Sequence, residues 1–270
     1  MIIFKSINKL NKELYGMKNV GFVPTMGSLH KGHISIIKKS KILSNKTLVS
    51  IFINPTQFDN KNDYKKYPKN LKRDINILVK YKVDYLLIPS FKELYGSKKI
   101  KKEKIDKKDK ILCAKFRKGH FEGVLTVINQ FLRKLKINKI YLGEKDYQQL
   151  FLVKKFIKKK RFKINIIPCK TIRQKNYFPY SSRNKLLSKS SIINGQKVSL
   201  ILNKFYLEIK KNKKKIHKLN LIKKSVLKCV DKIDYFEIRN KFNLKRKFSN
   251  KNFKIFIAYY LNKVRVIDNY

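Results

Sequence analysis

The sequence predicts an α/β protein with a doubly wound parallel sheet, followed by a smaller α+β domain. In residues 1–170, short apolar or β-branched runs alternate with segments of helical periodicity, as they do in βαβ units. After Pro168 this alternation stops, and two helical segments precede three apolar runs. We therefore expect a Rossmann-like domain over 1–170 and an α+β domain over 171–270, each within the usual size range of domains.

The individual elements follow from local patterns. The predicted strands of the first domain are apolar runs, most of which stop at Pro or a polar residue, at 20–23, 47–53, 83–88, 139–142 and 164–167. The predicted helices repeat apolar residues at helical spacing, at 34–43, 71–79, 124–135 and 146–159. The second domain should contain two helices and three strands, at 189–211, 219–230, 235–238, 253–261 and 264–267. Asn262-Lys263 predicts a tight turn between the last two strands.

The charge of the chain is extreme, with 68 Lys+Arg against 17 Asp+Glu and a formal net charge of +51. Such a charge raises the possibility of RNA binding, because Lys and Arg neutralise phosphates. However, Lys, Asn, Ile, Phe and Tyr are all abundant, while Trp is absent and Ala occurs only at Ala114 and Ala258. This is the pattern of an AT-rich genome, and the Lys residues are spread along the whole chain. We favour mutational bias and expect no nucleic-acid partner.

Other compositional features indicate a reduced, cytosolic protein. The three cysteines form no CxxC pair, which argues against a disulfide framework and a Cys-based zinc site. No apolar run approaches the roughly 20 residues of a membrane span, so we expect no membrane partner. The first ten residues are interrupted by Lys5 and Asn8 and lack a signal-peptide core. The hydrophobic content of 43% is sufficient for a sizeable core.

The densest chemical signal is PTMGSLHKGH over 24–33, directly after a predicted strand and at the start of a helix. Gly27 and Gly32 permit close approach of the backbone to a ligand, and a helix N-terminus offers N–H groups to a phosphate. His30 and His33 share one helix face and can donate hydrogen bonds to a phosphoryl group. A zinc site and two plain surface histidines are the alternatives. No carboxylate or Cys lies nearby in sequence as a third zinc ligand, so we expect no metal site in the protein.

Three further polar segments are NPTQF over 54–58, GEKDYQQ over 143–149 and YSSRN over 180–184. Asn54 and Gln57 offer neutral amides, and Lys145 and Arg183 offer cations for phosphate. Gln149 falls one turn into the following helix. The first two segments, like PTMGSLHKGH, follow predicted strands. Because ligands bind at the carboxyl ends of parallel strands, we expect these three segments to converge there, with YSSRN closing over them from the second domain.

The sequence HKGH over 30–33 matches the His-x-Gly-His signature of the nucleotidylyltransferase superfamily. Together with SIFINPTQF, GEKDYQQL and SSRN, in this order and spacing, it resembles the pantothenate synthetases (pantoate–β-alanine ligases) over essentially the whole chain. The resemblance implies an ATP-dependent condensation of (R)-pantoate with β-alanine. The products would be pantothenate, AMP and diphosphate, formed through a pantoyl-adenylate intermediate. It also implies Mg²⁺ as a cofactor and a homodimer.

The resemblance further implies roles for single residues. His33 is expected to be the proton donor, with His30 and Lys145 as further catalytic residues. Gln57, Gln149 and Asn54 are expected to bind pantoate, and Gln57 also β-alanine. The expected ATP ligands are Met26, Gly27, Ser28, Leu29, His30, Lys31, Gly32, His33, Gly143, Glu144, Lys145, Asp146, Ile172, Tyr180, Ser181, Ser182 and Arg183.

Four positions leave alternatives open. Tyr180 replaces the usual Leu of the family, and ATP affinity depends on whether the backbone alone binds there. His120 is expected to form a structural turn, with a role at the edge of the site as the alternative. Asp74 can orient Mg²⁺ only by loose analogy with the family, and we do not select it. The Lys-rich segment 98–110 is either a flap over a site or a solvated loop.

Another adenylyl- or cytidylyltransferase is the competing enzyme class.

Overall fold

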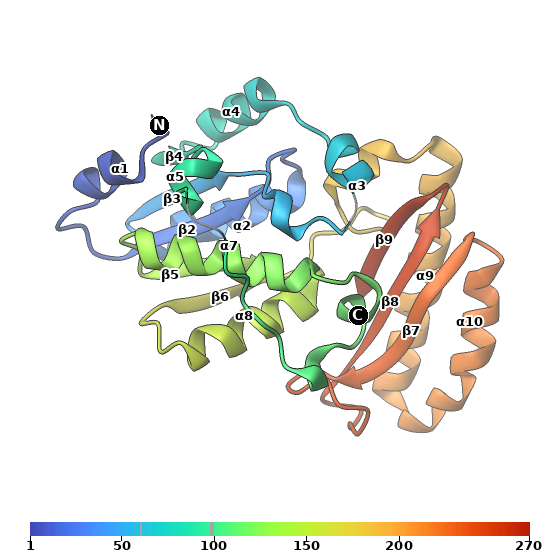
Figure 1. The fold of residues 1–270 in the computed structure, drawn as a ribbon. Coiled ribbons are helices and arrows are strands. Elements are labelled where there is room, and N and C mark those ends of the chain that lie inside the picture. The colour runs from blue at the N-terminus through green and yellow to red at the C-terminus, as the bar shows by residue number, and fades with distance from the viewer. Residues whose placement is uncertain (60, 98–99) are drawn as a thin grey trace. The chain divides into compact units, whose positions relative to one another are not determined.

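The computed structural model describes residues 1–59, 61–97 and 100–270. The chain divides into two compact units, Met1–Lys170 and Thr171–Tyr270. The first unit contains a parallel six-stranded sheet and the second an antiparallel three-stranded sheet (Figure 1).

The sheet of the first unit has the strand order β1-β4-β3-β2-β5-β6, and every neighbouring pair is parallel. Its strands are β1 (Ile2–Phe4), β2 (Val20–Thr25), β3 (Lys46–Ile51), β4 (Tyr85–Leu87), β5 (Lys139–Gly143) and β6 (Asn165–Cys169). The five predicted strands are confirmed with small shifts of their ends. The structure adds β1, a short strand with two exposed residues that lacks the buried pattern on which the prediction relied.

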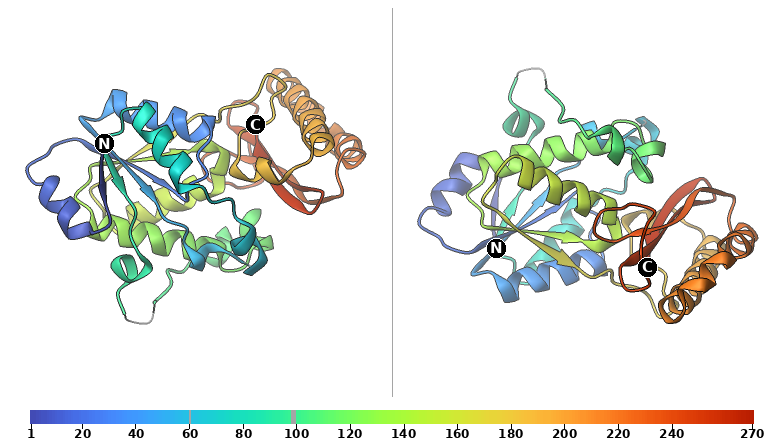
Figure 2. Two further views of the ribbon diagram at one scale, coloured as in Figure 1. Left: turned by 90° about the horizontal axis from the view of Figure 1, so that it is seen from above. Right: turned by 90° about the horizontal axis from the view of Figure 1, so that it is seen from below.

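Helices cover both faces of this sheet (Figure 2). They are α1 (Ile7–Glu13), α2 (Lys31–Leu43), α3 (Lys61–Lys66), α4 (Leu71–Lys80), α5 (Phe91–Tyr95), α6 (Cys113–Phe116), α7 (His120–Lys134) and α8 (Tyr147–Lys159). On one face, Ile37 of α2 and Leu78 of α4 pack in a cluster with Val49 of β3. On the other face, Phe131 of α7 packs against Phe22 of β2. The predicted doubly wound α/β fold is therefore confirmed.

Among the described residues of this unit, short 3-10 helices lie in the loops at η1 (Pro55–Gln57), η2 (Lys107–Asp109) and η3 (Glu144–Asp146). The chain proceeds outward from β2 through β3 to β4 and then returns to place β5 on the other side of β2. The direction in which successive strands are added therefore reverses between β2 and β5. Open α/β sheets bind their ligands at such a point.

The second unit packs two helices on its antiparallel sheet. Its elements are η4 (Ser182–Leu186), α9 (Lys189–Lys211), η5 (Lys213–Lys218), α10 (Leu219–Leu227), β7 (Lys232–Asn240), β8 (Phe253–Leu261) and β9 (Val264–Asn269). Leu202 and Phe205 of α9 share a buried cluster with Ile255 and Ile257 of β8. Asn262 and Lys263 both have positive φ, 46° and 65°, as a tight hairpin turn of type I′ requires. The predicted α+β arrangement and its turn are confirmed.

The segment predicted as a Lys-rich loop is anchored where the structure describes it; Lys98 and Lys99 lie outside the described residues. Lys155 of α8 forms ion pairs with Asp106 and Asp109, at 2.5 Å each. Glu103 accepts a hydrogen bond from Asn129 of α7 at 2.8 Å. The few acidic residues of this segment therefore tie it to two helices, so a plain solvated loop is a poor description of residues 103–109.

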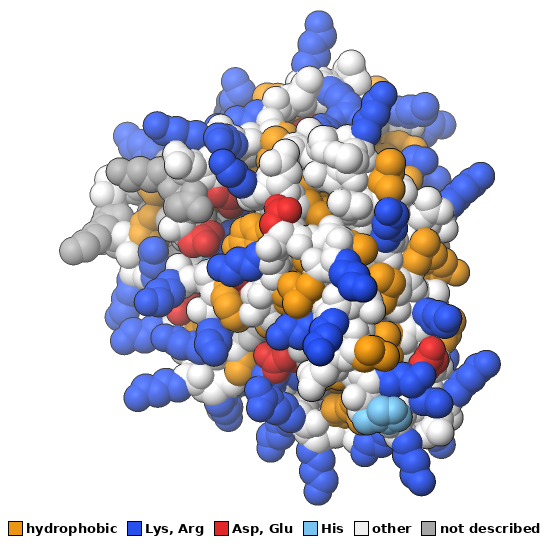
Figure 3. All heavy atoms as spheres, turned by 90° about the vertical axis from the view of Figure 1, so that its right-hand side faces the viewer, with side chains coloured by type: hydrophobic (Ala, Val, Ile, Leu, Met, Phe, Trp, Pro, Cys, Tyr) orange, Lys and Arg blue, Asp and Glu red, His pale blue; other side chains and the backbone are white. Residues whose placement is uncertain are grey.

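Lys and Arg side chains are distributed over the face of the molecule that Figure 3 shows, and they do not gather in a single stripe. This agrees with their even spread along the sequence. Across the three described stretches of the chain, no helix combines the length and apolar character needed to cross a membrane.

Candidate active site

Three of the four predicted site segments begin at one edge of the parallel sheet. β3, β2 and β5 are adjacent in that order and run in the same direction. PTMGSLHKGH takes in the end of β2, NPTQF follows β3, and GEKDYQQ starts at the last residue of β5. The three segments therefore meet, as the sequence predicts, at the point where the strand order reverses.

A buried carboxylate holds the loop between β2 and α2. Gly27 and Ser28 both adopt left-handed backbone conformations, with φ of 75° and 53°. Asp74 of α4 is only 1% exposed, and its two carboxylate oxygens accept hydrogen bonds from Ser28 N at 2.6 Å and Leu29 N at 2.8 Å. Both oxygens are thus committed to the protein backbone, so the structure indicates that Asp74 shapes the loop, and it does not support the suggested orientation of Mg²⁺.

His30 and His33 lie against each other at the start of α2, with ring centroids 4.1 Å apart. The Nδ1 atom of His30 accepts a hydrogen bond from Gly32 N at 3.1 Å, which leaves the proton of the neutral ring on Nε2. The Nδ1 atom of His33 is buried and has no hydrogen-bond partner among the residues that the structure describes. Burial lowers the pKa of His33 to about 4, so this ring is neutral at pH 7.

Lys145 and Asp146 of η3 lie close enough to His33 for both charges to act on it. After burial, Asp146 raises and Lys145 lowers the pKa of His33. The Lys145 side chain is 17% exposed, and its ammonium lies 3.8 Å from a carboxylate oxygen of Asp146. A largely buried ammonium whose charge acts on His33 is a suitable anion-binding group. The structure thus brings Lys145 to the histidine pair, as predicted.

Asn54 and Gln57 form a connected pair at the end of β3. The Nδ2 atom of Asn54 donates to Gln57 Oε1 at 3.2 Å and to the Gly123 carbonyl at 3.3 Å. Its Oδ1 accepts from the Tyr95 hydroxyl at 3.0 Å, and burial raises the pKa of Tyr95 to about 12, so this hydroxyl keeps its proton. Gln57 Nε2 contacts the sulfur of Met26, a weak acceptor that a ligand oxygen can replace. Asn54, only 1% exposed, therefore orients Gln57.

The two adjacent glutamines of α8 have different environments. Gln148 is buried and donates to the backbone carbonyls of Asp109 and Ile111. Gln149 is part-exposed on the first turn of the helix, and its amide makes no hydrogen bond to a protein group in the described part of the chain. Of the two, Gln149 is the side chain available to a ligand.

The second unit holds the remaining predicted ligands in one loop. Tyr180 N donates to the Ile172 carbonyl at 3.2 Å, which brings Ile172 beside the YSSRN segment. Ser181 caps η4, and its hydroxyl accepts from Arg183 N at 3.4 Å. The loop is tied to β9 by Arg173, whose guanidinium binds both carboxylate oxygens of Asp268 at 2.8 and 2.9 Å.

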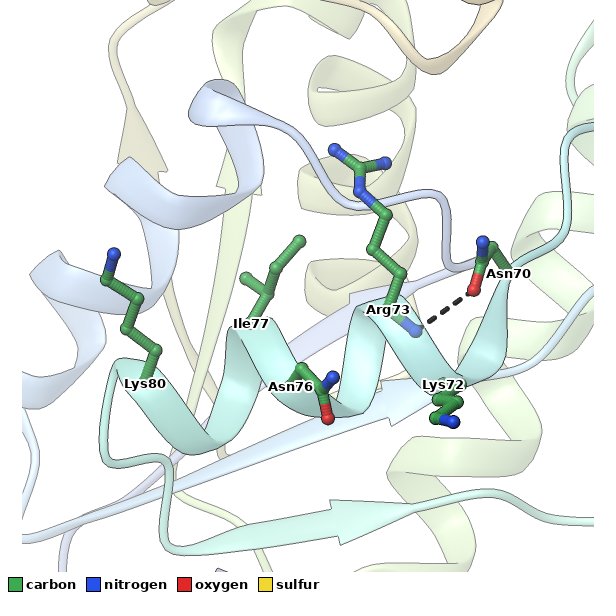
Figure 4. Close-up of a pocket in the computed structure, with 6 residues that line it drawn as sticks. All are labelled: Asn70, Lys72, Arg73, Asn76, Ile77 and Lys80. Atoms are coloured by element: carbon green, nitrogen blue, oxygen red, sulfur yellow. Dashed lines mark hydrogen bonds between the residues drawn. The ribbon is translucent and has the colours of Figure 1, made fainter.

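A pocket of about 420 Å³ lies on α4, and none of the predicted site residues lines it. Its lining residues are Asn70, Lys72, Arg73, Asn76, Ile77 and Lys80. Figure 4 shows that their side chains point in different directions from one helix. Since it contains none of the histidines and all its lining residues come from one helix, we place the chemistry at the sheet edge instead.

A family model described as "Pantoate-beta-alanine ligase" matches residues 2–270 of the chain. The chain belongs to the pantoate-beta-alanine ligase family. Pantothenate synthetase of Francisella tularensis subsp. novicida (strain U112) is 41% identical over 98% of this chain and 94% of that protein. Pantothenate synthetase of Francisella philomiragia subsp. philomiragia is 40% identical, over 100% and 97%.

Solved structures of pantoate-beta-alanine ligases have the same fold. The Francisella tularensis ligase, complexed with beta-gamma ATP and beta-alanine, matches with a TM-score of 0.85 and 39% identity. The match covers 100% of this chain and 97% of that one. Pantothenate synthetase from Thermus thermophilus matches with a TM-score of 0.88 and 27% identity, over 100% and 99% of the chains.

One role that the sequence alone did not reveal is that of Asp74, which holds the loop between β2 and α2. The sequence does contain a pattern that points to this role: Asp74 lies on the apolar face of its helix, one turn from Leu71 and Leu78. A carboxylate on a buried face needs hydrogen-bond donors, and the free N–H groups of a left-handed loop supply them. Within residues 1–59, 61–97 and 100–270, no group of three or more His, Cys, Asp or Glu could hold a metal ion.

Proposed function

We propose that this chain condenses (R)-pantoate with β-alanine at the expense of ATP, giving pantothenate, AMP and diphosphate through a pantoyl adenylate. The observation that carries the proposal is the juxtaposition of His30, His33 and Lys145 at one sheet edge, in a chain of this family. A 39% identical structure that carries beta-gamma ATP and beta-alanine supports the choice of substrates.

In the first step, the pantoate carboxylate attacks the α-phosphorus of ATP, and the bond from that phosphorus to the bridging oxygen breaks to release diphosphate. Because the substrate supplies the nucleophile, the protein must chiefly position the reactants and neutralise charge. The ammonium of Lys145 supplies the positive charge, and the ring N–H groups of His30 and His33 donate hydrogen bonds to the phosphoryl oxygens.

We assign His33 the role of proton donor, and we propose that bound triphosphate raises the pKa of its ring so that it can carry a proton. With a pKa of about 4, His33 is a neutral ring at pH 7 that can accept or donate a hydrogen bond. A triphosphate close to the ring favours the charged imidazolium and raises this pKa. His33 then carries a proton when negative charge develops on the leaving phosphate.

Gln57 and Gln149 are proposed to bind pantoate. Neutral amides can bind a carboxylate and hydroxyls without pairing with the attacking charge. Gln57 is held by Asn54, which we now assign to positioning this side chain beside the pantoate. In the second step, the amine of β-alanine, placed with the help of Gln57, attacks the acyl carbon. The bond from that carbon to the AMP oxygen breaks, and the nitrogen loses a proton.

The proposed ATP ligands are the backbone and side chains of Met26 to His33 and Gly143 to Asp146 in the first unit, with Ile172 and Tyr180 to Arg183 in the second. We propose that Mg²⁺ is held through the phosphates of ATP, because the described residues offer no cage of acidic ligands. We also propose a homodimer and a cytoplasmic location. The function of the second unit as a lid stays a prediction.

Exchange of labelled diphosphate into ATP tests the proposal. Exchange should require pantoate and should proceed without β-alanine, because the first step is reversible and needs only ATP and pantoate. A folded sample that exchanges diphosphate with another acid, or with none, would contradict the assignment. An RNA-binding protein would instead bind RNA with a steep salt dependence and show no exchange.

A further inference from the structure

The first turn of α7 packs tightly on the segment that carries Gln57. The His120 Nδ1 atom lies 2.5 Å from the Gln57 carbonyl oxygen. A Cβ atom at Gly123 would lie 2.2 Å from the carbonyl oxygen of Thr56, so only glycine permits this approach. The Gly123 carbonyl in turn accepts from Asn54, the residue that orients the Gln57 amide. The backbone and the side chain of Gln57 are therefore both held from α7.

The geometry determines which nitrogen of His120 carries the proton. Arg117 Nη1 lies 3.0 Å from His120 Nε2. A guanidinium only donates, so Nε2 must accept, and the proton of the neutral ring is on Nδ1. Nδ1 then donates to the Gln57 carbonyl, which only accepts. With each ring nitrogen satisfied by a protein group, His120 has no polar atom left for a substrate.

Arg117 also holds the far end of the Gln57 segment. Its Nε and Nη2 atoms donate to Asp59 at 3.1 and 2.8 Å, and Asp63 lies 3.6 Å from Nη2. Arg117 holds the pKa of Asp59 below its usual value against the opposing effect of burial, so this pair stays charged at neutral pH. Residues 57 and 59 are thus held by His120 and Arg117, which lie three positions apart in the sequence.

We propose that His120 is a positioning residue that fixes the Gln57 amide for pantoate, with Arg117 setting the tautomer of its ring. The inference rests on the proposed function, because Gln57 is a substrate ligand only there. The Gln57 side chain projects from a three-residue 3-10 helix, so its amide follows any displacement of the Gln57 carbonyl. A small displacement of a group that positions the substrate can lower the reaction rate by a large factor.

The test compares three variants in pantoate-dependent diphosphate exchange. His120→Phe keeps a ring but removes both hydrogen bonds, and should raise KM for pantoate roughly tenfold, the equivalent of one lost hydrogen bond. KM for ATP should change less than about twofold. His120→Asn places an amide donor near Nδ1 and should restore most of the affinity, whereas His120→Gln places it near Nε2 and should not.

His217→Phe is the matched control, because His217 Nδ1 makes the same kind of bond, to the Lys214 carbonyl at 2.6 Å, in the second unit. It should leave both KM values unchanged. In a Gln57→Ala background, His120→Phe should produce no further rise in KM for pantoate, since His120 acts through that side chain.

The outcomes separate the two proposals. Wild-type protein without pantoate-dependent exchange overturns the proposed function itself. Active wild-type protein with equal KM increases for ATP and pantoate in His120→Phe overturns the positioning role, as does equal activity of the Asn and Gln variants. If His120→Phe does not fold, the comparison of the Asn and Gln variants decides alone.

Discussion

Replacing Asp74 by Asn tests how the loop before the histidine pair is held. The carboxylate is 1% exposed and accepts two hydrogen bonds, from Ser28 N and Leu29 N. Asn keeps the size of the side chain but turns one acceptor into a donor, so one backbone N–H faces an N–H₂ group. A hydrogen bond to a charged group contributes about 1.5–3 kcal/mol, and an unsatisfied buried N–H costs about 1–3 kcal/mol.

We expect Asp74→Asn to lower the free energy of unfolding by about 3 kcal/mol, taking a value inside these ranges. For a unit of this size, that corresponds to a fall in Tm of roughly 6–12 °C. Because the same loop is proposed to bind ATP, KM for ATP should also rise in diphosphate exchange. Thermal unfolding followed by circular dichroism and exchange kinetics measure the two effects.

Asp84→Asn provides the matched control. Asp84 also accepts from a backbone N–H, that of Thr47 at 2.9 Å, but its side chain is 24% exposed, so water can replace the bond. The loss of this hydrogen bond in Asp84→Asn should lower the free energy of unfolding by about 1 kcal/mol and leave KM for ATP unchanged. If Asp74→Asn changes neither Tm nor KM for ATP by more than Asp84→Asn does, the argument that Asp74 shapes the loop is wrong.

Three further predictions concern the site. His33→Ala should reduce kcat of exchange by about 10²–10⁴-fold, as expected for a general acid, with Tm nearly unchanged; activity near wild type would exclude the proton-donor role. Gln149→Ala should raise KM for pantoate and leave Tm unchanged, whereas Gln148→Ala should lower Tm because two backbone carbonyls, one of them buried, lose their donor; the reverse pattern would contradict their assignment. In the absence of substrates, folded His33 takes up its proton near pH 4 and unfolded His33 near 6.5. Stability should therefore fall as the pH drops through this window, by at most about 3 kcal/mol, and less in His33→Asn, as measured by urea unfolding; equal losses would contradict the low pKa.

Much of the first unit followed from the sequence by itself. Parallel strands buried on both faces require continuous apolar runs, and those runs stop at Pro or polar residues that are visible in the sequence. Once the strands were assigned, sheet geometry required the segments after β2 and β3 and the segment at the end of β5 to meet. The strand β1 was missed, because two of its three residues are exposed and it pairs only with β4.

The tertiary structure decided which polar side chain has which partner. Asp74 and Ser28 are 46 positions apart, and His120 and Gln57 are 63 apart, so no local pattern relates them. A polar side chain in a partly buried site takes its role from the donors and acceptors that packing places within about 3 Å. Residue types and strand ends therefore located the candidate site, while long-range packing determines the hydrogen-bond partners of its side chains.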